Sequence, residues 1–338
     1  MVTIEQVARY AGVSVATVSR TLNNSPTVKP LTAKRVREAI AALNYIPNQS
    51  ARNLRRNESR VILALAPNFS NPYYSHILTG IGEQAREREY SVLICNTSGM
   101  EESERAFLNM LETRRADGAI ILGCNRDYKW LGEYAGRFPV VLCCEYVPEL
   151  QCPSVSIDNY KAAREMVEYL QSLGHRRIAM LGADNKYISS QLRLQGYRDA
   201  MTAAGTAVQD GWYRLADGDY SFASGQREAR RLLAMEPKPS AIFCVSDILA
   251  LSVISVAQSM GIDVPGELTV TGFDDVDYTT MFHPHLTTVY QPCYEMGRQS
   301  VNVVLDIING EEHFAAGRRF VEHRLVCRES SAETQKTF

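Results

Sequence analysis

Apolar residues recur at helical spacing three times near the N-terminus. The first stripe predicts a short helix over 3–10, the second a helix over 15–22, and the third a longer helix with Thr32 as its N-cap. Gly12 can make a left-handed turn between the first two, and Ser14 is suited to cap the second. The stripes are Ile4, Val7 and Ala8; Val18 and Leu22; and Val36, Ala39, Ile40 and Leu43. This order predicts a helix-turn-helix head.

The period of the apolar pattern changes after Arg60. Short runs of consecutive apolar residues, typical of buried parallel strands, alternate from there with amphipathic helices. The first expected strands are 61–65, 91–95, 118–122 and 140–143, with helices at 77–89 and 101–115. The pattern restarts with a helix at 162–173 and strands at 178–181, 241–244 and 268–271. This alternation predicts an α/β body of two similar lobes, each a parallel sheet flanked by helices, with a cleft between them.

The second expected helix has a small and almost uncharged sequence, VATVSRTL. A helix that enters the major groove of DNA needs small residues where it approaches the base edges. Val15, Ala16 and Arg20 are the expected base-facing residues. Arg20 can donate two hydrogen bonds to a guanine, and contact with phosphate alone is the alternative. The residues expected to bind phosphates are Ser14, Thr17, Ser19 and Asn23.

Charge is distributed unevenly along the chain, whose formal net charge is −2. Residues 1–60 hold 10 Lys and Arg against 3 Asp and Glu, so their formal charge is +7 and the rest of the chain carries −9. A basic head on an acidic body indicates that the head alone binds a polyanion. Chance clustering of basic residues is the simpler alternative.

Composition and motifs narrow the class of protein. The 338 residues are 45% hydrophobic and 22% charged, as in ordinary globular proteins. We expect a cytoplasmic protein without membrane contact, because the sequence contains neither a run of ~18 apolar residues nor a secretory signal. The eight cysteines are scattered and are expected to be reduced and mostly buried. Since the sequence also lacks a glycine-rich nucleotide loop, a nucleophile elbow and a metal-ligand motif, we expect no enzyme activity, cofactor or metal.

Two N-terminal segments carry a family resemblance. The sequences TIEQVARYAGVSVATVSRTLN and NYIPNQSARNLRRNESR resemble the lactose-repressor (LacI/GalR) family of bacterial regulators, and the similarity continues to about Arg328. The resemblance implies a helix-turn-helix head at 1–46, a hinge at 47–60 and a periplasmic-binding-protein-like body at 61–338. Within the body it implies an N-lobe of about 61–160 plus 291–322, a C-lobe of about 161–290 plus 323–330, and a tail at 331–338.

The segment 47–56, PNQSARNLRR, has by itself the composition of a solvated basic linker. In the family this segment becomes a helix only on the operator, and a leucine wedges between bases of the minor groove. The matching residue is Leu54, and we assign its neighbour Arg55 to the DNA contact as well. The resemblance also implies a homodimer on a pseudo-palindromic operator. A dimer is favoured over a tetramer because the C-terminal sequence CRESSAETQKTF has no apolar heptads.

Ligands of open α/β sheets bind beyond the carboxyl ends of the strands. The candidate ligand-binding residues are therefore Asn71, Tyr73, Tyr74, Arg193, Tyr220, Phe222, Ser246 and Asp274. In the family, residues at the positions of Arg193 and Asp274 bond to hydroxyl groups of the effector, and aromatic residues cover its ring. Alternatives remain for several of them: packing for the aromatic residues, a structural ion pair for Arg193 and a helix cap for Asp274. We interpret Asp247 mainly as a helix cap.

The segments RNESR, PEL, SIDN, LQGY and FCVSD look most like the cytidine-responsive branch of the family. A nucleoside is the first expectation for the effector, and a pentose or hexose the second. The sequence thus predicts a DNA-binding transcriptional repressor whose operator affinity depends on a small ligand. The rival class is a ligand-binding module with nonspecific nucleic-acid anchoring, and sequence preference at moderate salt separates the two.

Overall fold

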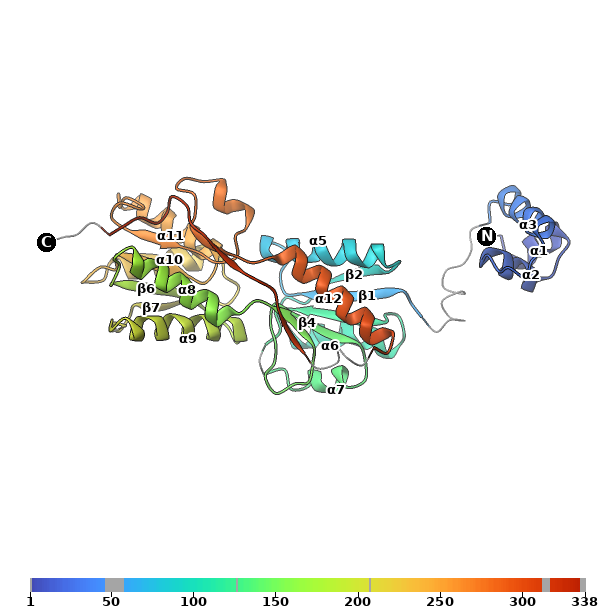
Figure 1. Cartoon of the computed structure of the whole chain (residues 1–338), viewed down its shortest axis with the longest axis horizontal. Helices are drawn as coiled ribbons and strands as arrows, with labels where there is room; N and C mark the ends of the chain where they lie inside the picture. The colour runs from blue at the N-terminus through green and yellow to red at the C-terminus, as the bar shows by residue number, and fades with distance from the viewer. Residues whose placement is uncertain (1, 46–57, 126, 207, 312–316, 335–338) are drawn as a thin grey trace. The chain divides into compact units, whose positions relative to one another are not determined.

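The computed structural model describes residues 2–45, 58–125, 127–206, 208–311 and 317–334 (Figure 1). The chain divides into two compact units, Met1–Ser59 and Arg60–Phe338, which we call the head and the body. Among the described residues, none of the helices is long and apolar enough to cross a membrane.

In its described residues, the head consists of α1 (Ile4–Ala11), α2 (Val15–Leu22) and α3 (Pro30–Ala42). Ser14 caps α2, as expected, because its hydroxyl accepts a hydrogen bond of 3.2 Å from the backbone N–H of Thr17. The turn before it passes through Gly12, whose φ of 62° lies in the left-handed region. All three helices contribute to a small apolar core of Val7, Ala8, Ala11, Val18, Val36 and Ala39.

The start of α3 differs from the sequence prediction. The helix begins at Pro30, with Lys29 at the N-cap position and no side-chain capping bond. Proline suits the first helical position because its φ is already helical and its missing N–H would have no partner there. The prediction that Thr32 caps this helix was therefore wrong.

Six strands form the first sheet of the body, which we call the N-lobe together with its helices. In spatial order they are β11 (Arg318–Phe320), β5 (Ser154–Ser156), β4 (Val140–Cys143), β3 (Gly118–Leu122), β1 (Val61–Ala66) and β2 (Ser91–Asn96). Each neighbouring pair is parallel. The helices are α5 (Pro72–Glu87), α6 (Glu101–Glu112), α7 (Leu131–Ala135) and α12 (Cys293–Ile308).

The helices α5 and α12 run side by side on the N-lobe (Figure 1). Two glycines permit their close approach. A Cβ atom on Gly80 would lie 2.1 Å from the carbonyl oxygen of Tyr294, and one on Gly297 would lie 2.2 Å from that of Ile77. The pair joins the start of the body to a segment more than 200 residues later in the chain.

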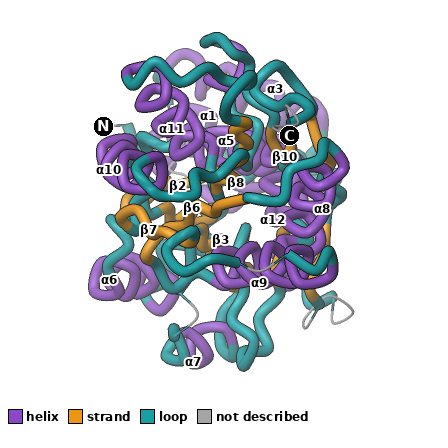
Figure 2. Tube along the Cα trace, turned by 90° about the vertical axis from the view of Figure 1, so that its left-hand side faces the viewer, coloured by secondary structure: helices purple, strands orange, loops and turns teal. Residues whose placement is uncertain are grey.

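The C-lobe contains a second parallel sheet. Its strands are, in spatial order, β7 (Tyr213–Asp217), β6 (Ile178–Asp184), β8 (Ala241–Cys244) and β9 (Thr269–Thr271). The helices are α8 (Asn159–Ser172), α9 (Ile188–Ala203), α10 (Phe222–Leu233) and α11 (Asp247–Ser259), with the short 3-10 helix η1 (Asp277–Thr280). Figure 2 shows the strands of the body enclosed by helices. The expected α/β class, with parallel sheets flanked by helices, is confirmed.

Two short strands cross between the lobes. β10 (Thr288–Tyr290) leads from the C-lobe to α12, and β12 (Arg324–Val326) returns from β11. They pair antiparallel, with Val289 opposite Leu325. A third connection, between β5 and α8, completes the link. Each lobe is therefore assembled from separate stretches of the chain.

Candidate ligand cleft and nucleic-acid interface

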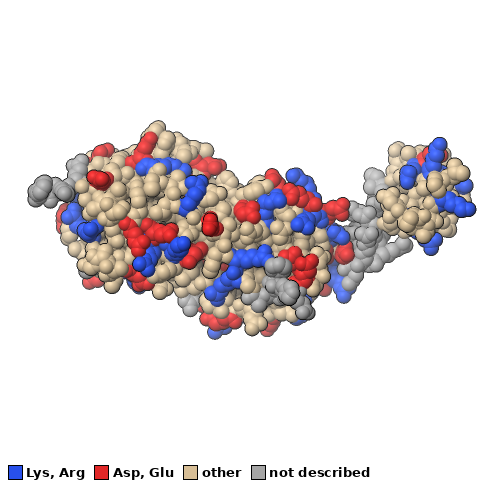
Figure 3. Space-filling model, viewed as in Figure 1, with Lys and Arg blue, Asp and Glu red and all other residues tan. Residues whose placement is uncertain are grey.

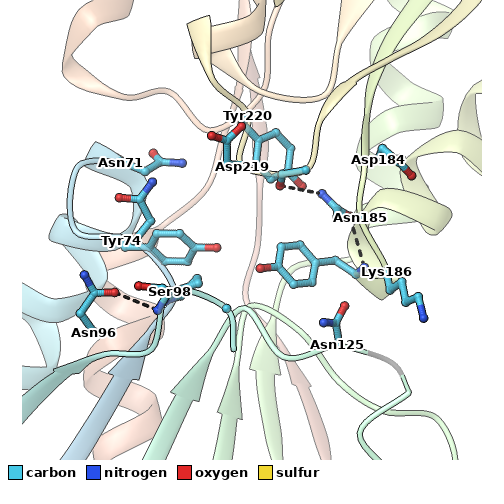
Figure 4. A pocket seen from close by; sticks show the side chains of 15 residues that line it. Asn71, Tyr74, Asn96, Ser98, Asn125, Asp184, Asn185, Lys186, Asp219 and Tyr220 are labelled. Carbon is cyan, nitrogen blue, oxygen red and sulfur yellow. Dashed lines mark hydrogen bonds between the residues drawn. The ribbon is translucent and has the colours of Figure 1, made fainter. Parts of the chain in front are cut away.

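The space between the lobes contains a cavity of about 590 Å³, which we call the outer chamber (Figure 4). This volume lies within the ~300–1,000 Å³ typical of small-molecule sites. Figure 4 shows Tyr74 and Asn71 of the N-lobe facing Asn185 and Tyr220 of the C-lobe. The lining residues are Pro67, Asn68, Asn71, Tyr74, Asn96, Ser98, Gly99, Asn125, Asp184, Asn185, Lys186, Tyr187, Gly218, Asp219 and Tyr220.

A second cavity of about 30 Å³, the inner chamber, shares part of this lining. Its size is that of one or two water molecules. It is lined by Asn71, Tyr73, Tyr74, Glu145, Tyr187, Ser189, Arg193, Tyr220, Val245, Ser246 and Asp274. Asn71, Tyr74, Tyr187 and Tyr220 line both chambers, so the two are adjacent parts of one cleft.

Helix α9 holds Arg193 in the inner chamber, where the side chain is buried. The guanidinium donates to the side-chain oxygen of Asn159 at 2.8 Å and to the carbonyl oxygen of Val245 at 2.6 Å. It also lies over the ring of Phe273, 3.7 Å from the ring centroid. The nearest carboxylate oxygen, on Asp274, is 4.0 Å away. Arg193 is thus fixed in position by uncharged partners, which leaves the contact with Asp274 loose.

Asp274 follows β9 and is buried. Its φ of 119° is rare for a residue other than glycine. Gln291 donates to its carboxylate at 2.8 Å and accepts from the hydroxyl of Tyr73 at 3.3 Å, so a chain of hydrogen bonds connects the lobes. Burial raises the pKa of Asp274 to about 7, although Arg193 and Gln291 favour the charged form. Asp274 does not cap a helix, because η1 begins later, with Val276 at its N-cap position.

Glu145 makes a second, direct connection between the lobes. It follows β4 of the N-lobe, and its carboxylate accepts hydrogen bonds from the backbone N–H and the hydroxyl of Ser189, at 3.0 and 2.5 Å. Ser189 lies in the first turn of α9, where N–H groups lack helical partners. Burial raises the pKa of Glu145 to about 7, although the bonds from Ser189 oppose this rise.

The two polar residues after β8 have structural partners. Ser246 is the N-cap of α11 and accepts from the backbone N–H of Leu249 at 3.3 Å, while it also lines the inner chamber. Asp247 accepts from the N–H of Val276 at 2.9 Å and from the hydroxyl of Thr288 at 2.6 Å. The interpretation of Asp247 as the cap was therefore wrong, because Ser246 occupies that position.

The candidate aromatic residues separate into two groups. Tyr73 and Tyr74 are buried at the start of α5, and Tyr220 bonds to Ser190 at 3.1 Å through its hydroxyl. These three line the cleft. Phe222, at the start of α10, is 43% exposed and lines neither chamber.

Comparison with known proteins identifies the family. A family model described as "Bacterial regulatory proteins, lacI family" matches residues 3–48, and a "Periplasmic binding protein-like domain" matches residues 167–331. The transcriptional repressor CytR of Escherichia coli strain K12 is 37% identical over 330 residues, which cover 97% of this chain and 96% of CytR. The chain belongs to the lacI family.

Further relatives agree with this membership. Catabolite control protein A of Priestia megaterium is 36% identical over 312 residues, 92% of this chain and 93% of that protein. The lac repressor dimer bound to operator and the anti-inducer ONPF has a similar structure, with a TM-score of 0.89, 27% identity and coverage of 98% and 99%. The expected class, a ligand-controlled DNA-binding transcriptional repressor, is confirmed. The relatives are transcriptional regulators and not enzymes.

In this family member, α2 turns Val18 and Thr21 toward the core of the head. Ala16 and Arg20 are exposed, as expected for base-facing residues, whereas Val15 is half-buried against the core. Of the expected phosphate contacts, Ser14 and Asn23 are exposed, and Thr17 and Ser19 are half-buried. On the visible face of the head, basic side chains outnumber acidic ones (Figure 3). Leu54 and Arg55 lie outside the described residues.

Sequence reasoning missed several residues of the cleft. Glu145 lies just beyond the end of the buried strand β4, so the rule that selected Asp274 could also have selected it. Tyr187 lies in the loop after β6, whose role could not be inferred from its sequence. The asparagines of the outer chamber other than Asn71 are Asn68, Asn96, Asn125 and Asn185. They have no local signal, because amides are common in all loops.

Proposed function

We propose that this lacI-family protein represses transcription as a homodimer on a pseudo-palindromic operator, and that a nucleoside in the interlobe cleft controls its operator affinity. The protein then acts in the cytoplasm, where a DNA-binding regulator meets the chromosome. The observation that carries the nucleoside proposal is the division of one cleft into two chemically different chambers.

The inner chamber matches a polyhydroxyl group. The Arg193 guanidinium and the Asp274 carboxyl group offer donors and acceptors with fixed geometry, and such charge-assisted bonds are strong in a buried site. The outer chamber matches a nucleobase, since amides can pair with the polar edge of the base and tyrosine rings can cover its face. A ribose in the inner chamber and a base in the outer chamber therefore account for both linings.

Ligand entry is coupled to movement of the lobes in this proposal. The inner chamber holds only about 30 Å³, so a sugar ring requires the lobes to separate locally. The bonds from Ser189 to Glu145 join the two lobes across that chamber and break or lengthen as it opens. The crossing strands transmit the change to the N-lobe, which leads to the hinge. Thermodynamic linkage then requires operator DNA to change nucleoside affinity by the same factor.

Exposed apolar side chains support the homodimer. Leu93 and Ile94 on the edge strand β2 are 41% and 46% exposed, and Met281 and Phe282 after η1 are each 61% exposed. Apolar surface of this kind is typical of protein interfaces. We expect analytical ultracentrifugation to give a dimer. Ile94→Glu combined with Phe282→Glu should give a monomer with weakened operator binding, because the two heads that bind the operator half-sites are then no longer joined.

The test of the ligand class is calorimetric titration of the full chain. We expect a nucleoside such as cytidine to bind at least ~10-fold more tightly than ribose or the free base, because each of these fills one chamber only. Asp274→Asn should weaken nucleoside binding by about tenfold and leave operator binding unchanged. Asp210→Asn, at an exposed position of the same lobe that lines neither chamber, is the matched control.

A free pentose or hexose is the second candidate, because the asparagines of the outer chamber also suit hydroxyl groups. Equal affinity for a nucleoside and its sugar would favour this candidate and contradict the base-binding role of the outer chamber.

The DNA contacts have their own test. Arg20→Ala should reduce discrimination among operator sequences, and Leu54→Ala should weaken operator binding while effector binding stays intact. Binding to random DNA at moderate salt as tight as binding to an operator would instead favour nonspecific anchoring.

A further inference from the structure

Three potential metal ligands converge on the surface of the C-lobe, away from the cleft. His283 and His285 precede β10, and Glu329 follows β12. Within the described residues, they form the only group of three or more His, Cys, Asp or Glu side chains whose ligand atoms lie within 4.8 Å of one another. All three remain accessible to solvent to some degree.

The distances from the histidine nitrogens to the carboxylate are near the spacing of neighbouring ligands around a tetrahedrally coordinated ion. Nδ1 of His283 lies 2.9 Å from one carboxylate oxygen of Glu329, and Nδ1 of His285 lies 3.5 Å from the other. Two ligands of one zinc ion, each bonded at ~2.1 Å with tetrahedral angles, are ~3.4 Å apart. The rings of the two histidines are stacked, with centroids 4.3 Å apart and planes inclined by 26°, so their nitrogens are presented together.

The backbone holds the cluster in place. The N–H of His285 donates to the Glu329 carboxylate at 3.1 Å, and its carbonyl accepts from the N–H of Ser330 at 3.0 Å. Ser330 is buried and also donates through its hydroxyl to Val270 of β9 at 2.6 Å. The two segments that carry the ligands are therefore joined to each other and to the sheet, and an ion would need only small side-chain movements.

We propose that His283, His285 and Glu329 bind a divalent transition-metal ion of the zinc type. Two imidazoles and one carboxylate are a donor set suited to Zn²⁺ and neighbouring metals, whereas Mg²⁺ and Ca²⁺ prefer oxygen ligands only. Three protein ligands leave one coordination position for water. The site is separate from the effector cleft, since none of its residues lines either chamber.

The position of the site determines how a bound ion would affect the structure. His285 leads into the strand that leaves the C-lobe, and Glu329 lies on the segment that returns to it. A bound ion clamps these two segments where they meet the C-lobe. Because the folded state alone presents the three ligands together, the ion raises the melting temperature. The alternative is a cluster held by hydrogen bonds between histidine and glutamate without any ion.

The test is titration of the full chain, without a polyhistidine tag, with ZnCl₂ in a buffer that does not bind metals. We expect one ion per chain and a higher melting temperature. His283→Ala and Glu329→Gln should each weaken binding roughly a hundredfold, because even loss of a group that only orients a metal ligand costs ~10–100-fold. Glu329→Gln retains an oxygen that can accept the N–H of His285, so its fold should be preserved.

His76→Ala is the matched control, since His76 is another accessible histidine, 42% exposed. It should bind Zn²⁺ like the unmodified protein. Substituting Co²⁺ should give the visible absorption bands of a tetrahedral ion, and Glu329→Gln should abolish them. The proposal is overturned if the unmodified protein binds no Zn²⁺, or if His283→Ala and Glu329→Gln bind it as tightly as His76→Ala does. Either result would show that hydrogen bonds alone hold the three side chains together.

Discussion

The two chambers of the cleft share four side chains but differ in nearly every physical property. The inner chamber gathers buried ionisable groups, Arg193, Asp274 and Glu145, around about 30 Å³. The outer chamber surrounds about 590 Å³ with amides, tyrosines and exposed charges. Electrostatic interactions are several-fold stronger where water is excluded. In the proposed function, the inner chamber is therefore where ligand binding, lobe position and protein stability are joined, and the outer chamber is where the identity of the ligand is selected.

The sharpest test of this contrast is Arg193→Met. The substitution leaves Asn159, the Val245 carbonyl and the Asp274 carboxyl group buried without their cationic partner. We expect the free energy of unfolding to fall by about 3–5 kcal/mol, the usual cost of breaking a buried charged network. Urea denaturation measures this change in the free energy of unfolding. Arg198→Met, at an exposed position on the same helix, should change stability by less than ~0.5 kcal/mol. An equal loss of stability in Arg193→Met and Arg198→Met would contradict the special role of the buried inner-chamber network.

Glu145→Gln tests the inner chamber through pH. Burial raises the pKa of Glu145 from 4.5 to about 7, so between these values the folded protein keeps a proton that the unfolded chain has lost. This group therefore makes the unmodified protein less stable as pH rises through that window. The stability of Glu145→Gln relative to the unmodified protein should increase by about 3 kcal/mol from pH 4 to pH 8. If urea denaturation gives the same stability difference between Glu145→Gln and the unmodified protein at pH 4 and at pH 8, the raised pKa is contradicted.

Tyr187→Leu tests the outer chamber. The substitution keeps an apolar side chain but removes the aromatic face. Nucleoside affinity should fall about threefold to tenfold, since such ring contacts contribute ~0.5–1.5 kcal/mol. Ribose affinity should fall less than nucleoside affinity, because Tyr187 also borders the inner chamber but its ring face is proposed to cover the base. Calorimetric titration with both ligands measures the effects, and an equal loss for ribose would show that the chambers do not divide the ligand as proposed.

The smallest effect should come from the rim of the outer chamber. Lys186 pairs with Asp127 across the lobes at 2.9 Å, but the side chains are 69% and 58% exposed. Exposed pairs of this kind contribute ~0–1 kcal/mol. Lys186→Met should therefore change nucleoside affinity by less than about threefold, measured at low and high salt. A change of an order of magnitude would assign charge recognition to the outer chamber as well.

The sequence predicts some residues of the cleft and not others. Asn71, Ser246 and Asp274 were predicted because they lie in the segments that follow strands, and parallel strands end at one edge of a sheet. The same rule does not say which side chains turn inward. The separate interpretation of Asp247 as a helix cap was wrong, because Ser246 occupies the cap position. Phe222 was selected for its aromatic ring, but it lies outside both chambers.

The contacts that give the inner chamber its properties are not local. Arg193 bonds to Asn159 and to the Val245 carbonyl, 34 and 52 residues away, and Glu145 bonds to Ser189, 44 residues away. No short-range pattern encodes such partners, because they depend on how two sheets are placed against each other. The strands and helices were predictable since burial imposes a period on each segment. Even there, Pro30 moved the start of α3 ahead of Thr32.

The interrupted connectivity of the lobes has a consequence for how the protein is made. The head is a unit of its own and can fold once about 60 residues have been synthesised. The N-lobe sheet waits for β11 and the crossing pair for β12, which ends at Val326. At ~5–20 residues per second, the ribosome delivers these strands roughly 15–50 s later. In each new molecule, the DNA-binding head can therefore fold well before the body that binds the effector is complete.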